Sequence, residues 1–170
     1  GGFTTIPDYL LKENQVFSQT GAVYPVFAAD QTEQFMQDEA EMKFIRLSYP
    51  DLNEKVLDCL KKESNTIILL HSTHQNQVGE MRAFFHTLLN NQLLNPVILC
   101  RKYVVNDLAS LQIQSAADLG VLFLDGFGDG IFLEKDEEMS LKSIGVEQIN
   151  AVAFGILQAC RVRVTKTEYI

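Results

Sequence analysis

The sequence predicts an α/β fold made of repeated βα units around a parallel sheet. Short apolar runs recur along the chain, at residues 23–28, 44–48, 66–71, 96–101 and 131–134. The stretches between these runs carry apolar residues at helical spacing. The chain has 170 residues, of which 46% are hydrophobic and 21% charged. A chain of this size and composition can bury one proper core, so it is expected to fold as one unit.

Net charge and hydropathy exclude two classes of partner. The formal net charge of -8 repels phosphate backbones, so we expect no nucleic acid partner. No apolar run approaches the ~20 residues of a membrane span. The chain also does not begin with a basic segment followed by an apolar one, as an exported protein would. We therefore expect a cytoplasmic protein with no membrane partner.

The cysteines do not form a recognisable pattern. Cys59, Cys100 and Cys160 are far apart and odd in number, with no C-x-x-C pair. Neither a disulfide framework nor a zinc site is therefore indicated. We expect reduced thiols, buried as small hydrophobic side chains.

The first elements follow from turn and cap residues. Residues 3–22 contain Pro7 and Gly21 and show no clear period, so we expect an N-terminal segment with little regular structure. After the first apolar run, Asp30 and Glu33 have the N-cap and N3 spacing of a capping box, which predicts the start of a helix.

Further helices are indicated by apolar stripes. Pro50 and Asp51 suit the first turn of the second helix. Each of three stripes is expected to face the core, and none suggests a cofactor site. The stripes are Leu52, Val56, Leu57 and Leu60; Val78, Met81, Phe85, Leu88 and Leu89; and Val146, Ile149, Val152, Ala153, Ile156 and Leu157.

Residues 119–124 are ambiguous, because V-L-F-L at 121–124 has the composition of a buried strand while residues 131–134 predict another strand shortly afterwards. Two parallel neighbours need a crossover of a dozen or more residues, which residues 126–130 cannot supply. Either the two runs form an antiparallel hairpin, or the first run is the end of a helix.

The residues upstream favour the helix. Asn106 or Asp107 can cap it, and Gly126 can end it in the left-handed conformation. Four leucines recur on one side of such a helix: Leu108, Leu111, Leu119 and Leu122. We therefore predict a helix over residues 107–125, and five strands each followed by a helix.

A glycine motif follows this helix. Gly126, Gly128 and Gly130 form G-x-G-x-G, which superficially suggests a nucleotide site. A dinucleotide fingerprint runs strand, glycine loop, helix, so that helix N-terminal N–H groups face the phosphate. Here the loop follows a helix and opens a strand, which predicts a structural turn instead.

The histidines do not define a metal site. His71 and His74 lie at the end of the third predicted strand, where α/β enzymes place their chemistry. No Cys or Glu stands at a telling distance to act as a third ligand, so a polar loop is favoured. His86 is expected to be a partly covered surface residue on a helix.

Polar residues at predicted strand ends leave an alternative open. Ser48, His71, Ser72, Arg101 and Asp129 occupy such positions without forming a defined nucleophile–base pair. They keep a small-molecule or phosphate-binding module as one alternative, and a pure interaction domain as another.

Three stretches carry a family resemblance: LFLDGFGDGIFLE at residues 122–134, FGILQACRVR at 154–163 and TKTEYI at 165–170. Together they closely resemble the large, plant-like and chlamydia-like form of 4-hydroxy-3-methylbut-2-enyl diphosphate synthase. The resemblance is weaker, though collinear, from Val23 through Tyr103. The family implies that residues 119–124 are helical, in agreement with the argument above.

The resemblance implies a multidomain iron–sulfur enzyme. Bacterial members of this oxidoreductase family reductively open 2-C-methyl-D-erythritol 2,4-cyclodiphosphate in non-mevalonate isoprenoid biosynthesis. They use a [4Fe-4S] cluster and an electron donor, ferredoxin or flavodoxin. The large form has a catalytic (β/α)8 barrel, then an inserted domain resembling a partial TIM-type barrel, then the cluster domain.

The chain is similar to most of that inserted domain. The resemblance divides it into an N-terminal segment (1–22), the inserted α/β domain (23–160) and a connector to an absent iron–sulfur domain (161–170). Its expected partners are the catalytic barrel and the iron–sulfur domain of the same polypeptide.

One departure from the family pattern suggests a structural role. Where the short form carries an Arg and a Ser that face the diphosphate, this chain has Phe132 and Glu134, and a carboxylate repels a diphosphate. We therefore expect a spacer with no catalytic, cofactor-binding or metal-binding residue, inactive by itself.

Overall fold

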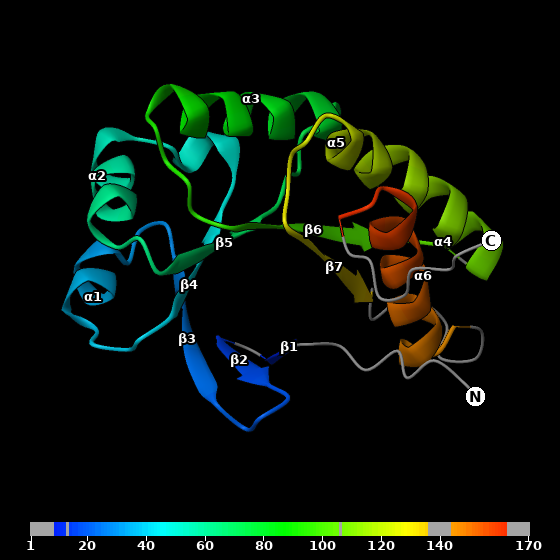
Figure 1. The fold of residues 1–170 in the computed structure, drawn as a ribbon, viewed down its shortest axis with the longest axis horizontal. Coiled ribbons are helices and arrows are strands. Elements are labelled where there is room, and N and C mark those ends of the chain that lie inside the picture. Colours follow the sequence, from blue (N-terminus) through cyan, green and yellow to red (C-terminus); the bar gives the residue numbers. More distant parts are fainter. Residues whose placement is uncertain (1–8, 13, 106, 136–143, 163–170) are drawn as a thin grey trace. The chain divides into compact units, whose positions relative to one another are not determined.

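The computed structural model describes residues 9–12, 14–105, 107–135 and 144–162 (Figure 1). The chain divides into two compact units, one at Pro7–Ile98 and the other from Leu99 onward. From β3 onward, the strands of both units alternate with helices. The predicted α/β class with repeated βα units is confirmed.

The first unit contains a mixed sheet in which the strands follow one another in chain order. β1 and β2 are antiparallel, as are β2 and β3, whereas β3, β4 and β5 are parallel neighbours. Its described elements are β1 (Tyr9–Lys12), β2 (Gln15–Ser18), β3 (Val23–Ala28), α1 (Thr32–Gln37), β4 (Lys43–Leu47), the 3₁₀ turn η1 (Tyr49–Asp51), α2 (Glu54–Lys62), β5 (Thr66–Leu70) and α3 (Gln77–Asn90).

The expectation of little regular structure before residue 23 is wrong. β1 and β2 form a hairpin, so the described residues hold seven strands rather than the expected five. Each of the two strands has only four residues, too few to show a clear period. β1 is held by pairing with β2, and β2 is held by pairing with β3 and by burial of Val16, which is 2% exposed.

Aromatic side chains pack on both faces of this sheet. The Phe27 ring meets the Phe35 ring of α1 edge to face, with centroids 5.4 Å apart. Phe44 points from the other face of the sheet and contacts Tyr9 and Tyr24, at centroid distances of 5.9 and 6.1 Å. Alternation of side chains along β3 and β4 places these residues on opposite faces.

Two predicted helix starts need correction. Asp30 is not the N-cap of α1: Gln31 occupies that position, and its Oε1 accepts from the Ala28 N–H at 2.8 Å. Pro50 belongs to the separate turn η1 rather than to α2. Asn53 caps α2 instead, because its side chain accepts from the Val56 N–H at 3.0 Å.

The predicted core stripes are largely correct. Val56 and Leu60 of α2 are buried, as are most members of the other two stripes: Met81, Phe85, Leu88, Ile149, Val152, Ile156 and Leu157. Two members are wrong, because Leu89 is 56% and Val146 62% exposed. Phe84, which was not predicted, is fully buried in α3.

The second unit contains the helix that was inferred over residues 107–125. Its described elements are the end of β6 (Val97–Tyr103), α4 (Leu108–Ser115), the π-helical turn η2 (Ala116–Gly120), α5 (Val121–Leu124), β7 (Gly130–Lys135) and α6 (Val146–Ala159). α4, η2 and α5 follow one another without a break, so the helical interpretation of residues 119–124 is confirmed. Leu119 and Leu122 are fully buried.

Both ends of this helix have the predicted caps. Asp107 accepts from the Ser110 N–H at 2.8 Å, and this hydrogen bond lowers the pKa of its carboxyl. Gly126 has φ +83°, in the left-handed region. The Gly126 N–H donates to the Phe123 carbonyl and the Phe127 N–H to the Leu122 carbonyl, which is the hydrogen-bond pattern of a Schellman motif.

No described helix is long and apolar enough to cross a membrane.

Candidate functional site

In the first unit, Ser48 at the end of β4 is held by its own turn. Its N–H and its Oγ each donate to Asp51 Oδ2 at 2.7 Å. The Asp51 N–H returns a bond to the Ser48 carbonyl at 3.1 Å. Ser48 therefore starts the turn η1, and its hydroxyl proton is already committed.

The polar residues after β5 are organised in a similar way. The Ser72 hydroxyl donates to Glu80 of α3. His74 Nδ1 accepts from the Asn76 N–H at 3.0 Å, and Asn76 in turn caps α3 through a 2.9 Å bond from the Gly79 N–H. His71 Nδ1 is buried and has no hydrogen-bond partner among the described residues. The hydrogen bonds of this polar loop therefore fix the N-terminal end of α3, in agreement with the expectation of a polar loop.

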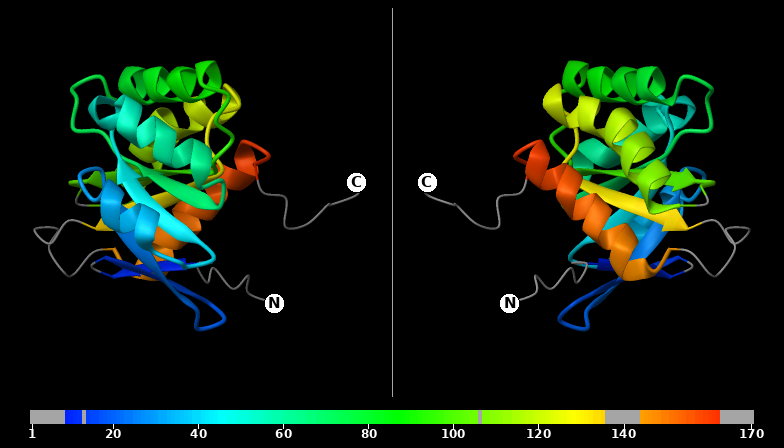
Figure 2. Two further views of the ribbon diagram at one scale, coloured as in Figure 1. Left: turned by 90° about the vertical axis from the view of Figure 1, so that its left-hand side faces the viewer. Right: turned by 90° about the vertical axis from the view of Figure 1, so that its right-hand side faces the viewer.

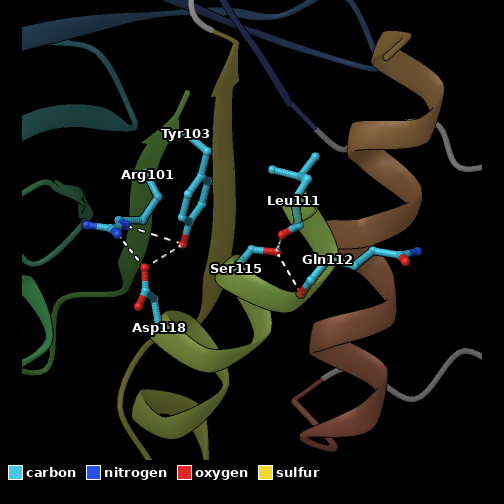
Figure 3. A network of polar contacts seen from close by, with 6 residues as sticks. All are labelled: Arg101, Tyr103, Leu111, Gln112, Ser115 and Asp118. Carbon is cyan, nitrogen blue, oxygen red and sulfur yellow. Dashed lines mark hydrogen bonds and ion pairs between the residues drawn. The ribbon is translucent and has the colours of Figure 1, made fainter. Parts of the chain in front are cut away.

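In the second unit, Arg101 belongs to a partly buried polar network (Figure 3). Its Nη2 is paired with Asp118 Oδ2, and the two side chains are 12% and 33% exposed. Arg101 Nε donates to the Tyr103 hydroxyl at 3.4 Å, and that hydroxyl donates to Asp118 Oδ2 at 3.2 Å. The guanidinium carbon also lies 4.9 Å from the centre of the Tyr103 ring.

The π-helical turn supplies the carboxylate of this network. Asp118 is the middle residue of η2, and Ser115 precedes the turn. The buried Ser115 hydroxyl donates to the Leu111 carbonyl at 2.5 Å, one helical turn back (Figure 3). A π-helical turn changes the direction in which the following side chains leave the helix axis. In this turn the Asp118 side chain points toward β6, where it pairs with Arg101.

The chemistry open to this network is limited. Burial raises the pKa of Tyr103 from 10.0 to about 12, so its phenol remains a neutral hydrogen-bond donor at physiological pH. The Arg101 charge is balanced by Asp118, which leaves the site without a surplus positive charge for phosphate. Arg101 Nη1 is buried without a hydrogen-bond partner among the described residues. The arrangement thus joins a strand to a helix and lacks a nucleophile.

The glycine motif forms a turn between α5 and β7. Gly128 has φ +91°, and a Cβ atom there would lie 3.0 Å from Phe123 and 3.1 Å from Leu99. Phe132 and Glu134 are half-buried on β7. Asp129 is exposed in the turn.

A shallow groove of about 390 Å³ lies between α1 and α2. Its lining mixes charges of both signs with apolar atoms, from Thr32, Glu33, Met36, Gln37, Lys55, Asp58, Cys59 and Lys62. The Lys55 ammonium lies 3.7 Å from Glu33. Burial raises the pKa of the Cys59 thiol, which keeps it protonated. The groove therefore holds no activated nucleophile.

The cysteines do not provide the donor set of an iron–sulfur cluster, which is held by Cys thiolates. Cys59 and Cys100 are buried and belong to different units. The Cys160 thiol lies 3.6 Å from the Gly120 carbonyl, and burial raises its pKa. Within the described ranges, no group of three or more Cys, His, Asp or Glu side chains could hold a metal ion.

The five strand-end residues of the alternative site are divided between the two units. Ser48, His71 and Ser72 belong to the first unit, and Arg101 and Asp129 to the second. Sequence reasoning did not find two of their partners, Glu80 and Asp118. No local signal could have shown these pairs, because eight and seventeen residues separate the partners. Their contact depends on how a helix is rotated against its strand.

Comparison with known proteins gives a consistent result. No family model and no solved structure matches the chain. A protein of Parabacteroides distasonis is 39% identical over 163 residues, which are 95% of this chain and 25% of that protein. A protein of Phocaeicola vulgatus is 38% identical over 95% of this chain and 26% of its own length. Both are named 4-hydroxy-3-methylbut-2-en-1-yl diphosphate synthase (flavodoxin).

A plant protein matches as well. The chloroplastic 4-hydroxy-3-methylbut-2-en-1-yl diphosphate synthase (ferredoxin) of Oryza sativa subsp. japonica is 36% identical over 129 residues, which are 71% of this chain and 16% of the rice protein. The chain spans about a quarter of the length of the bacterial relatives. Nearly the whole chain is therefore homologous to one segment of the 4-hydroxy-3-methylbut-2-en-1-yl diphosphate synthases, which confirms the resemblance seen in the sequence.

Proposed function

We propose that this chain is a structural segment of a synthase polypeptide that reductively opens 2-C-methyl-D-erythritol 2,4-cyclodiphosphate. The names of the relatives support the activity of the whole protein, and the coverage of about 25% supports the assignment of this chain to one segment. The complete polypeptide would be a cytoplasmic oxidoreductase that receives electrons from flavodoxin or ferredoxin, the donors that the relatives are named for.

Within that polypeptide, the segment acts as an inserted spacer between the catalytic barrel and the iron–sulfur domain. The observation that carries this proposal is that three strand-end side chains are hydrogen-bonded or paired within the fold. Ser48 is committed to a turn, Ser72 to Glu80, and Arg101 to Asp118. In an α/β enzyme these positions would face a substrate. Here they hold the scaffold together, so substrate and cluster would be bound elsewhere in the polypeptide.

The cluster belongs outside the described residues in this proposal, because the described cysteines do not converge. When bound, a [4Fe-4S] cluster supplies electrons for the reductive ring opening. The segment itself would contribute position: it would hold two neighbouring domains at a fixed separation. Positioning of reacting groups can account for a large part of an enzyme's rate, which makes a silent spacer functionally important.

The first experiment uses a synthase polypeptide of the relatives' length that contains this segment, called the long polypeptide below. Substitutions are made at the strand ends, and activity is assayed. Ser48→Ala, Ser72→Ala and Arg101→Gln should each leave kcat and KM for the cyclodiphosphate within about twofold, because none touches substrate. A rise in KM of tenfold or more, about 1.4 kcal/mol, would instead favour the small-molecule or phosphate-binding alternative. Thermal unfolding of each variant identifies losses that come only from destabilisation.

A second experiment asks whether the segment holds a cluster. The 170-residue chain is reconstituted with iron and sulfide, and its visible absorbance is recorded beside that of the long polypeptide. We expect cluster absorbance from the long polypeptide only. A stable [4Fe-4S] spectrum from the 170-residue chain would contradict the spacer assignment.

A further inference from the structure

Two helical segments of the second unit are almost without charge. The 17 residues from Leu108 to Leu124 contain one charged side chain, Asp118, which is paired with Arg101. The 14 residues of α6 also contain one, Glu147 in the first turn. By contrast, five of the nine residues of α2 are charged. The low charge is thus a property of these two segments and not of the chain.

The two weakly charged segments are neighbours, and each has an exposed side. α6 packs against α4 and η2, and Figure 2 (right) shows α4–η2–α5 and α6 side by side. Ile113 and Leu124 are 71% and 75% exposed. We call the following exposed residues the uncharged face: Ala109, Gln112, Ile113, Ala116, Ala117, Leu124, Ala151, Gly155, Gln158 and Ala159.

The composition of this face fits a surface that is covered by protein. Solvent-facing sides of helices normally carry charged residues, and interface cores are depleted of them. On α6, the small residues Ala151, Gly155 and Ala159 recur at intervals of four, and a Cβ atom at Gly155 would meet nothing within 4 Å. A neighbouring backbone can therefore approach this helix closely.

We propose that the uncharged face docks this segment onto the remainder of the same synthase polypeptide, against an apolar surface without charge. This inference rests on the proposed function. The relatives are about four times as long as this chain, so most of their polypeptide is available as the partner. A covalently linked surface is present at millimolar effective concentration, so a face of small and neutral residues suffices for stable contact.

A second copy of the chain is a poorer occupant. Each copy carries a formal net charge of -8, and the repulsion between two copies opposes their association. A self-associating surface would need enough apolar area to overcome this repulsion. The uncharged face instead consists mainly of Ala, Gly and Gln, with two large apolar side chains.

The test measures access to the face in the long polypeptide. Ala117→Cys and Ala151→Cys place single thiols on α4–η2–α5 and α6, at exposed positions. Gln34→Cys is the matched control, on the exposed side of α1 and outside the face. Each variant is reacted with a small maleimide with and without urea. Mass spectrometry then gives the labelling rate at each introduced site, separately from the native cysteines.

We expect both thiols on the face to react at least about tenfold more slowly than the control in the folded polypeptide, which corresponds to about 1.4 kcal/mol of docking. Equal rates at all three sites would overturn the proposal. If the labelling rate on the face is slow but rises on about hundredfold dilution, then a second copy covers the face. This result would overturn the proposal that the same polypeptide covers it. Synthase activity of the wild-type polypeptide is measured separately, so failure of the proposed function remains distinguishable.

Discussion

Arg101 and Asp118 form an ion pair that ties the end of β6 to the π-helical turn η2. The Tyr103 ring lies beside the guanidinium, and Asp118 Oδ2 accepts from both Arg101 Nη2 and the Tyr103 hydroxyl. A strand and a helix are thus joined by side chains that are seventeen residues apart. The two side chains meet only when the end of β6 and the turn η2 are both correctly oriented.

Removing the carboxylate should destabilise the second unit. Asp118→Asn leaves the 12% exposed Arg101 side chain without its counter-charge, and an unpaired buried charge is costly. Because Asp118 itself is 33% exposed, we expect a loss of about 1–3 kcal/mol in the free energy of unfolding rather than the full cost of a buried pair. Urea titration followed by circular dichroism measures the loss.

The matched control is the exposed pair of Asp58 and Lys61, whose charged atoms are 4.0 Å apart on side chains that are 66% and 49% exposed. Asp58→Asn should change the free energy of unfolding by less than about 0.5 kcal/mol. Equal losses in both variants would show that burial does not strengthen the Arg101 pair.

Tyr103 should make stability depend on pH in the alkaline range. Burial raises its pKa to about 12, so the folded state holds the phenolic proton more tightly than the unfolded state, whose pKa is near 10.0. The associated stability is present in full below pH 10 and is lost as the pH rises from 10 through 12. Two pKa units correspond to at most about 2.7 kcal/mol.

The measurement compares urea unfolding of the wild type and Tyr103→Phe at pH 9 and pH 11. Phe has no titrating group, so its loss of stability over this interval should be smaller than that of the wild type. Identical losses would show that the Tyr103 phenol does not titrate differently in the folded state.

The βα repeat was predictable because each strand of the repeat carries its own apolar run. Residues 23–28 form β3 as expected. The segment 119–124 was assigned correctly despite its strand-like composition. The rule on parallel crossovers excluded two parallel strands and left a hairpin or a helix, and the leucine spacing and end residues favoured the helix. The cap of Asp107 and the termination at Gly126 then followed from local chemistry.

The errors have a different physical origin. β1 and β2 are four-residue strands that depend on pairing, β1 with β2 and β2 with β3, and four residues hold too little information for a period. The π-helical turn has no sequence signature, so the Arg101–Asp118 pair could not be foreseen. Asp30 is not the cap because α1 begins at Thr32, which makes Gln31 the N-cap residue. For the two strands and for the ion pair, contacts between separate segments decide the outcome, whereas the cap of α1 is decided locally.

The glycine turn predicts two different mutational costs. Gly126→Ala should cost about 1 kcal/mol, because a Cβ atom there meets nothing within 4 Å and only the left-handed backbone is penalised. Gly128→Ala adds steric contact with Phe123 at 3.0 Å and Leu99 at 3.1 Å, so it should cost at least about 2 kcal/mol. Thermal unfolding of both variants tests the order, and a reversed order would contradict it.

Gln92 offers a stabilising substitution. It has φ +58° after α3, where the Gln92 N–H donates to the Leu89 carbonyl and the Leu93 N–H to the Leu88 carbonyl. This is the same pattern that Gly126 completes after α5. Gln92→Gly should therefore raise the free energy of unfolding by about 0.5–1 kcal/mol. Gln92→Ala is the control, which should give no such gain because it keeps a Cβ atom.

Lys43 tests whether packing or charge dominates at a buried cation. Its side chain is 4% exposed, and its ammonium donates to the Phe35 carbonyl at 2.8 Å, approaches Glu63 at 3.4 Å and lies 5.1 Å from the centre of the Phe35 ring. Lys43→Ala removes both the apolar stem and the ammonium, so it should cost about 2–4 kcal/mol. Lys43→Met keeps a stem of similar volume.

We expect Lys43→Met to cost less than about 1.5 kcal/mol, because Glu63 is 31% exposed and can turn to water once the cation is gone. Urea unfolding of the two variants gives the comparison. If Lys43→Met is as harmful as Lys43→Ala, then the ammonium contacts hold α1 (through Phe35) and the end of α2 (through Glu63) against the sheet. If it is nearly neutral, the stem does so by packing, and the charge of Lys43 is dispensable for the fold.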